Sequence, residues 1–357
     1  MKTKNRGRAT LAAALFGAIA IFAFAAQLRA QDPSPLNAPT STAQALWVAD
    51  DFVFMEVVGT SVPLLFGSLN SQPGGVTFDS NQNFWGTFCV GGKDNDGLVF
   101  ELTRSQLLKI KSGQTANAKV AFGNVSFLFD CPSALHFDSS GNLWVANSGH
   151  TFGTPSIMKY SPDQLATGGN VTPDAVFMLT DVGAASDMNF DASGNLWIAD
   201  NENISGVFEF DADQLSASGT QAITPNLQMT STATFTPQTI VFDQNGNLWV
   251  GRDHSPLLLF AASDLVGAGT ISPVPLATIQ PAKIDGFSTF PFPSGLAIDG
   301  HGNLWIASSN GGHKMRGSIA KFKAAKISTS GTPNPSLFLL TTQITQHPTL
   351  MTIGPQL

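Results

Sequence analysis

The tripeptide Arg252–Asp253–His254 is the best candidate in the sequence for acid–base chemistry. Asp253 could orient His254 as a general base, and Arg252 could hold an anion beside it. The alternative is that His254 is an independent surface residue. The other histidines are widely separated, without the spacing typical of zinc ligands: His136, His150, His301, His313 and His347. The sequence also has no Gly-x-Ser-x-Gly, phosphate-binding or haem-attachment motif.

A second candidate is an oxygen-ligand site for a divalent cation. Asp187 and Asp200 fall in one repeat of the sequence, and Asn147 falls in the preceding repeat. Two carboxylates and an amide could bind Ca or Mg through oxygen. The alternative, which we favour, is that Asp187 caps the loop before its strand and binds nothing.

Polar residues recur at the end of one predicted strand in each repeat, where they would face a common axial mouth. Loops and strand ends on a rigid scaffold are where binding sites usually lie. The positions in register are Asp50, Phe88, Asn147, Asp200, Arg252 and Ser308. We therefore predict ligand binding by Asp50, Asn147, Asp187, Asp200 and Arg252.

The elements that would position these residues are repeats of about 50–60 residues, a period typical of propellers and solenoids. Five copies share a Phe-Asp or Ile-Asp, a turn and a Trp. They are GGVTFDSNQNFWGTF (74–88), SALHFDSSGNLWVAN (133–147), SDMNFDASGNLWIAD (186–200), QTIVFDQNGNLWVGR (238–252) and SGLAIDGHGNLWIAS (294–308). Two further apolar stretches follow each hairpin, which makes four strands per repeat, as in a propeller blade.

The repeated residues themselves have a structural interpretation. Each Asp directly precedes a hairpin turn, so we expect Asp79, Asp138, Asp191, Asp243 and Asp299 to cap turns through backbone amides. We expect the Trp residues to be core. Gln82 stands where the other four copies have Gly, so we expect the first turn to differ.

The two ends of the chain complement each other. ALWVADDFVFMEVVG (45–59) reads as a repeat that begins at its second strand, and PTLMTIGP (348–355) reads as a first strand with nothing after it. Pairing them would close the ring and leave no open end. We predict an all-β fold, a six-bladed β-propeller of four-stranded blades closed by its N- and C-terminal strands. The alternative is an open stack of five hairpin units with polar caps.

The best copy, PSGLAIDGHGNLWIAS (293–308), resembles the NHL repeat. It is also similar to the six-bladed superfamily of SMP-30/gluconolactonase and streptogramin lyase. The resemblance extends from about Ala45 to the end and implies a propeller. It implies no activity, because such propellers include enzymes and binding scaffolds. The metal enzymes of that superfamily use Glu, Asn and Asp at the mouth. Asp50 follows a Trp strand instead of belonging to a leading Gly-Glu motif, so no catalytic residue carries over.

The N-terminus has the form of a secretory signal peptide. A basic start is followed by an apolar run from Leu11 to Ala26, shorter than the ~20 residues of a spanning helix, and Ala30 precedes a plausible cleavage site. We predict a signal peptide at 1–30, a linker at 31–44 and the propeller at 45–357. Cys89 and Cys131 are the two cysteines, and export suggests that they form one disulfide between neighbouring repeats.

The chain has a formal net charge of −7, and loss of the basic leader would make it more acidic. This balance argues against nucleic acid and anionic lipid as partners. We therefore expect a monomeric scaffold, periplasmic or secreted and not inserted in a membrane. It would bind a small molecule or a protein at the axial mouth. The alternative is a divalent-metal-dependent hydrolase or lyase of the lactonase type.

Overall fold

The computed structural model describes residues 44–50, 53–57, 64–67, 73–89, 97–112, 116–118, 120–122, 129–149, 154–167, 171–202, 205–230, 235–252, 256–284, 286–309, 317–340 and 350–355. The predicted signal peptide and nearly all of the linker lie outside these residues. So do Asp253 and His254, and the side chain of Asp50.

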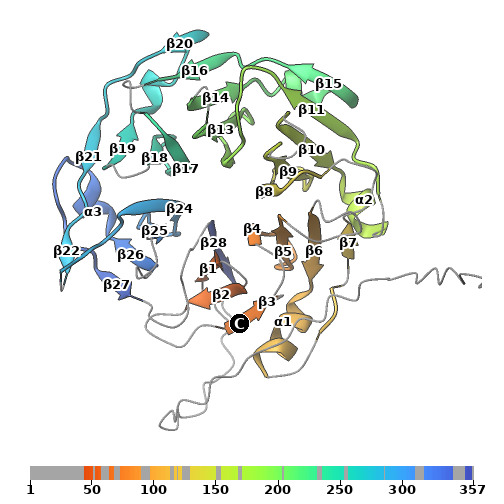
Figure 1. The fold of residues 1–357 in the computed structure, drawn as a ribbon, viewed down its shortest axis with the longest axis horizontal. Helices are drawn as coiled ribbons and strands as arrows, with labels where there is room; N and C mark the ends of the chain where they lie inside the picture. Colours follow the sequence, from red (N-terminus) through yellow and green to blue (C-terminus); the bar gives the residue numbers. More distant parts are fainter. Residues whose placement is uncertain are drawn as a thin grey trace, which may run out of the picture.

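Strands of the described residues form sheets of four or five strands that stand around a central axis (Figure 1). Sheet 1 is β28 (Met351–Pro355), β1 (Gln44–Asp50), β2 (Val53–Val57) and β3 (Leu64–Gly67). Sheet 2 is β4 (Pro73–Phe78), β5 (Phe84–Phe88), β6 (Leu98–Leu102) and β7 (Val120–Phe122). Sheet 3 is β8 (Pro132–Phe137), β9 (Leu143–Asn147), β10 (Ser156–Tyr160), β11 (Ala175–Leu179) and β15 (Gly219–Ile223).

Sheet 4 is β12 (Asp187–Phe190), β13 (Leu196–Asp200), β14 (Gly206–Phe210), β16 (Leu227–Met229) and β20 (Gly269–Ile271). Sheet 5 is β17 (Pro237–Phe242), β18 (Leu248–Arg252), β19 (Leu257–Phe260) and β21 (Ala277–Ile279). Sheet 6 is β24 (Phe292–Ile298), β25 (Leu304–Ser309), β26 (Ser318–Phe322) and β27 (Leu337–Leu340). The predicted all-β propeller is confirmed.

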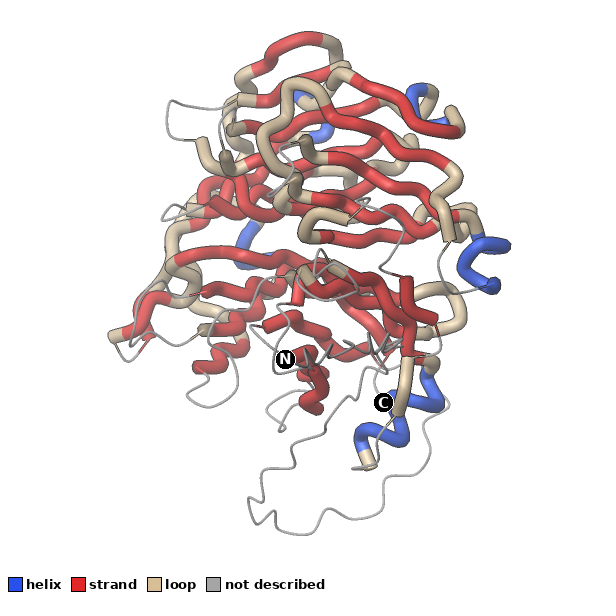
Figure 2. Tube along the Cα trace, turned by 45° about the vertical axis from the view of Figure 1, so that its right-hand side comes forward, coloured by secondary structure: helices blue, strands red, loops and turns tan. Residues whose placement is uncertain are grey.

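The remaining elements are short. A two-stranded hairpin joins β22 (Lys283–Ile284) and β23 (Phe287–Ser288). The helices α1 (Arg104–Lys111), α2 (Pro162–Thr167) and α3 (Ala324–Ile327) and the 3₁₀ turns η1 (Gln214–Ser216) and η2 (Ala262–Asp264) follow the third strands of their sheets. Figure 2 shows that strands make up most of the described trace.

The repeated Asp caps its turn as predicted. Asp138 Oδ1 accepts the backbone N–H groups of Ser140 and Asn142 at 2.9 and 3.0 Å. Its Oδ2 accepts Trp144 Nε1 at 2.8 Å, which ties the turn to the second strand. The prediction that the first turn differs is wrong. Gln82 adopts a φ of 63°, and Asp79 accepts the equivalent amides of Asn81 and Asn83. Gln82 thus occupies the left-handed conformation that glycine takes elsewhere.

The repeated Trp packs on the neighbouring sheet. Trp47 of sheet 1 lies 5.1 Å from Phe78 of sheet 2, between ring centroids. The pairs Trp85–Phe137, Trp144–Phe190 and Trp197–Phe242 repeat this contact between successive sheets. Because each Phe directly precedes a capping Asp, the hairpin motif encodes both the turn and the core between sheets.

The two ends of the chain meet in sheet 1. β1 pairs antiparallel with β28, with Leu46 opposite Ile353 and Trp47 opposite Thr352. Leu46, Trp47 and Val48 are almost fully buried. The expected pairing of N- and C-terminal strands is therefore present, and β28 supplies sheet 1 with its first strand.

Candidate functional site

An axial cavity lies where the first strands of the sheets converge. Its volume is about 290 Å³, and every lining residue belongs to β4, β8, β12, β17, β24 or β28 or, in the case of Leu350, directly precedes β28. Ligand pockets typically run from about 300 Å³ upward, so this cavity suits a small molecule. The ring architecture alone brings these six strands together.

One residue from each first strand lies opposite the Trp of its own sheet. In order around the ring these are Thr352, Thr77, His136, Asn189, Val241 and Ala297. All six line the cavity. The first four are polar and adjacent, and the last two are apolar, so the cavity has a polar arc and an apolar arc.

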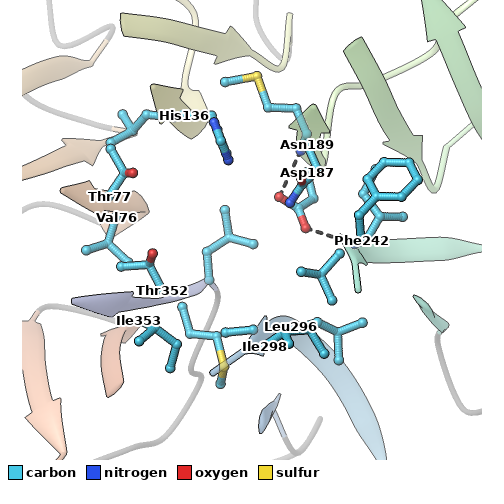
Figure 3. A pocket seen from close by; sticks show the side chains of 17 residues that line it. Val76, Thr77, His136, Asp187, Asn189, Phe242, Leu296, Ile298, Thr352 and Ile353 are labelled. Atoms are coloured by element: carbon cyan, nitrogen blue, oxygen red, sulfur yellow. Dashed lines mark hydrogen bonds between the residues drawn. The ribbon is translucent and has the colours of Figure 1, made fainter. Parts of the chain in front are cut away.

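Figure 3 shows the two arcs from close by. Thr352, Thr77, His136 and Asn189 follow one another along one side of the cavity, while Phe242, Leu296 and Ile298 lie on the other. We call the four residues Thr352, Thr77, His136 and Asn189 the polar arc.

The polar arc has unused hydrogen-bonding capacity. Within the described part of the chain, the side chains of Thr77, Asn189 and Thr352 make no hydrogen bond to another protein group. Thr77 is only 8% exposed. Buried polar groups are normally hydrogen-bonded to protein or water, so these groups are available to whatever fills the cavity.

His136 adds an acceptor to this arc. Its Nδ1 lies 2.7 Å from the carbonyl oxygen of Phe137, and a carbonyl can only accept, so Nδ1 carries the proton. Burial lowers the pKa of His136 below its usual range, against the opposing effects of the Phe137 carbonyl and Asp138. The imidazole is therefore neutral at pH 7, and Nε2 presents a lone pair.

Asp187 also lines the cavity, but both its oxygens are engaged. Oδ2 accepts Thr239 Oγ1 at 2.7 Å and the Ile240 N–H at 2.9 Å, and Oδ1 accepts the Met188 N–H at 2.8 Å. The equivalent position in sheet 2 is Gly75, where a Cβ would lie 2.8 Å from the Ala134 backbone. A side chain such as that of Asp187 therefore does not fit there. Asp187 thus bridges β12 to the next first strand, β17, instead of capping the preceding loop.

This bridge predicts a pH dependence of stability. Burial raises the pKa of Asp187 from 3.8 to about 6, although its three hydrogen bonds oppose the shift. The folded state then holds this proton more tightly than the unfolded state, so stability contributed by Asp187 falls as pH rises from about 4 to 6. Two pKa units correspond to about 3 kcal/mol.

Asp187→Asn is expected to remove this contribution to the difference in unfolding free energy between pH 4 and pH 7, measured by urea unfolding. Asp264→Asn, at an exposed site, is the control; equal slopes in Asp187→Asn and wild type would contradict the assignment.

The strand-end residues bind their own loops instead of meeting at a mouth. Asn147 Oδ1 accepts the Asp130 N–H at 2.6 Å, and Ser308 Oγ accepts the Phe292 N–H at 2.9 Å. Asp200, fully buried, accepts the N–H groups of Gly183 and Ala184. Asn147 and Asp200 therefore fasten the loop that enters the first strand of their own sheet, and Ser308 fastens the first residue of β24.

The three proposed metal ligands are not brought together. Asp187 pairs with Ala199 across β12 and β13, so Asp200 occupies the alternate face of the sheet. Asn147 lies in sheet 3, hydrogen-bonded to Asp130. The described residues contain no group of three or more His, Cys, Asp or Glu side chains placed to hold a metal ion.

Arg252 is buried at the end of β18, with 8% exposure. Its Nε donates to the Pro256 carbonyl at 3.4 Å, and its guanidinium lies 6.0 Å from the Phe235 ring. Burial lowers the pKa of Arg252. Its predicted partners Asp253 and His254 lie outside the described residues.

The predicted disulfide is present. Cys89, directly after β5, is bonded to Cys131, directly before β8. The bond therefore links sheets 2 and 3. Disulfides are typical of oxidising compartments, which agrees with export. Among the described residues, no helix has the length and apolarity needed to span a bilayer.

Comparison with known proteins finds structural neighbours but no family. No family model and no curated protein matches the chain, so the NHL and SMP-30 resemblance is not confirmed. A protein of unknown function from Bacteroides caccae is similar in structure, with a TM-score of 0.57 and 13% identity over 88% of this chain and 99% of that one. The extracellular domain of a putative one component system from B. thetaiotaomicron gives a TM-score of 0.43 and 15% identity, over 83% of this chain and 36% of that one. At 13% identity the likeness to the B. caccae protein extends to the fold alone.

Proposed function

We propose that this protein is an exported six-bladed β-propeller that binds a small uncharged molecule in its axial cavity. The observation that carries the proposal is the polar arc, a run of side chains with unused hydrogen-bonding capacity from four adjacent first strands. The six blades correspond to sheets 1–6. Export is supported by the signal-like N-terminus and the disulfide.

The lining argues for an uncharged ligand. The described residues that line the cavity include no Lys or Arg to attract an anion. Asp187 is the only carboxylate among these described lining residues, and both its oxygens accept hydrogen bonds from protein donors. The His136 imidazole is neutral. Burying an ion without a partner is costly, so both signs of charge are disfavoured.

The two arcs also indicate which chemical groups the ligand would carry on each side. Hydroxyl or amide groups on one edge would donate to His136 Nε2 and exchange hydrogen bonds with Thr77, Asn189 and Thr352. An apolar face would pack on Val241 and Ala297. A small cyclic polyol, sugar or amide with one apolar face has this chemistry.

A thermal-shift screen tests the proposal. The panel contains neutral monosaccharides, polyols and small amides, together with carboxylate and phosphate analogues of the same size. Binding to the folded state raises the melting temperature by mass action, and we expect this from neutral members only. A shift by charged analogues alone, or by no member at millimolar concentration, would refute the proposal.

Two variants locate the site of any such binding. Thr77→Val and Asn189→Leu each remove hydrogen-bonding groups of the polar arc, and each is expected to weaken binding by about tenfold. Thr220→Val makes the same change at an exposed position of β15 and is the control. Binding that survives both cavity variants unchanged would place the ligand elsewhere.

A further inference from the structure

The outer edges of three sheets are covered by the sheet that follows them. β15, from the connection between β14 and β16, pairs parallel with β11 of sheet 3. β20 pairs in the same way with β16 of sheet 4. Gly331, between β26 and β27, bridges in parallel to Ile279 of β21 in sheet 5. Figure 1 shows β15 and β20 at the outer margin of the ring beside β11 and β16.

Within the described residues, the outer strands β3, β7 and β27 have no such cover. For β27 of sheet 6, the connection that would supply one is short, because it would have to come from sheet 1. Residues 211–226 separate β14 from β16, and residues 261–276 separate β19 from β21, whereas only residues 58–63 separate β2 from β3. Sheet 1 is the sheet that follows sheet 6 around the ring. Within the described residues, β27 pairs with β26 and with no other strand.

The side chains of β27 reflect this missing cover. Its sequence is Leu-Phe-Leu-Leu, and all four side chains are half-buried. In the equivalent strands β11, β16 and β21 most side chains are fully buried. Leu337 and Leu339 pack toward sheet 1, and Phe338 packs toward sheet 5. β27 has neither charge nor proline, the residues that usually protect an edge strand from pairing.

The register identifies the backbone groups that face outward. In sheet 5, the Thr278 carbonyl accepts the Gly331 N–H, and the Gln280 N–H donates to the Gly331 carbonyl. Ala277 lies opposite Leu259, and Leu337 occupies the same place opposite Lys321. The outward residues of β27 are therefore Phe338 and Leu340, equivalent to Thr278 and Gln280.

We propose that the edge of β27 binds an extended, uncharged segment of another protein as a parallel fifth strand. The molecule itself supplies the template, because two of its edges take such a strand and a third takes a parallel bridge at Gly331. Its two donated strands begin Gly-Thr and continue to an Ile, GTQAI and GTI. Small and β-branched residues of this kind suit the apolar side chains of β27, and main-chain bonds would provide the affinity, as in other edge-strand recognition.

Other occupants fit less well. Residues 31–43 of the chain contain Pro33, Pro35 and Pro39, and proline cannot donate to a sheet ladder. A second copy offers no spare donor among β15, β20 and Gly331, since each is already paired in its own ring. Two β27 edges related by a twofold axis would pair antiparallel, unlike the three covered edges.

Binding of a labelled peptide with the sequence of residues 217–224, which contains β15, tests the proposal on the full chain. We expect saturable binding, with hydrogen-exchange protection gained by Phe338 and Leu340. In β15 the N–H groups of Gly219 and Gln221 face β11. A peptide N-methylated at Gln221 is therefore expected to bind at least about tenfold more weakly. N-methylation at Thr220, whose N–H faces away, should have little effect.

A protein variant provides the complementary test. Phe338→Pro removes the outward N–H but leaves the ladder with β26 intact, and should weaken peptide binding by about tenfold or more. Phe338→Leu keeps the N–H and should bind like wild type. Absence of saturable binding at 1 mM peptide, on the order of the weakest specific affinities, would overturn the proposal. Equal binding of both methylated peptides would also overturn it, as would concentration-dependent dimers of the chain that Phe338→Pro abolishes.

Discussion

Deletion of residues 350–357 is expected to abolish the cooperative fold. β28 pairs with β1 from Gln44 to Val48, so its loss would expose Leu46, Trp47 and Val48, which are nearly fully buried. Burial of one such side chain contributes about 1.5–3 kcal/mol, and a domain has only about 5–15 kcal/mol in total. Sheet 1 would also lose the strand that completes the cavity wall. The measurement is urea unfolding of the truncated chain by circular dichroism.

Complementation separates the loss of this strand from a general effect of truncation. A synthetic peptide of residues 347–357, added in excess, is expected to restore a cooperative transition to the shortened chain. A peptide of the same composition in scrambled order is the control. A truncated chain that unfolds cooperatively near the wild-type midpoint would show that β28 does not close the ring.

Removal of the disulfide is expected to cost about 4 kcal/mol. Cys89 and Cys131 are separated by 42 residues, and loops of this length lose several kcal/mol of unfolded-state entropy on cross-linking. The double change Cys89→Ser with Cys131→Ser avoids a free thiol. The free energy of unfolding in urea, measured for the oxidised wild type and the double variant, gives the difference directly.

Reduced wild-type protein is the internal control for this experiment. Under a thiol reductant it should unfold at the same urea concentration as the double variant. A loss below about 1 kcal/mol would mean that the link between sheets 2 and 3 adds little beyond their packing. Partial unfolding confined to sheets 2 and 3 would violate two-state behaviour and would appear as a second transition.

The repeat predicted much of the fold because its residues act locally. An Asp before a turn and a Trp after it determine their own contacts wherever the hairpin sits, as Asp138 and Trp144 illustrate. The additional C-terminal strand could also be predicted, since PTLMTIGP resembles a first strand without a partner. Gln82 did not change its turn as expected, because a non-glycine residue can adopt the left-handed conformation at modest cost.

The candidate site was harder to predict because it depends on the ring. Thr77, His136 and Asn189 occupy the variable position directly before the repeated Phe, where nothing local indicates a function. Only the convergence of the first strands makes them neighbours. The aligned sequence nevertheless carries a useful signal. The residue before each Phe-Asp lies opposite a Trp, and polar residues at this position in successive repeats indicate one side of the axis.

For the strand-end residues, the sequence predicted ligand binding where the structure shows contacts with neighbouring loops. Asn147 and Asp200 looked like ligands because they are polar and in register, but each binds the backbone of a neighbouring loop. Loops that enter a buried strand carry amides that must find acceptors. A polar side chain at such a position is therefore more often structural than functional, which sequence spacing alone does not reveal.

The most direct test of the axial binding site is the ¹⁵N spectrum of the His136 imidazole, assigned with a His136→Gln variant. At pH 7 the free protein should show a neutral ring with its proton on Nδ1 and a bare Nε2. A neutral compound that raises the melting temperature should shift the Nε2 resonance by donating a hydrogen bond to it. An imidazolium at pH 7, or an Nε2 signal that such a compound leaves unchanged, would contradict binding by the polar arc.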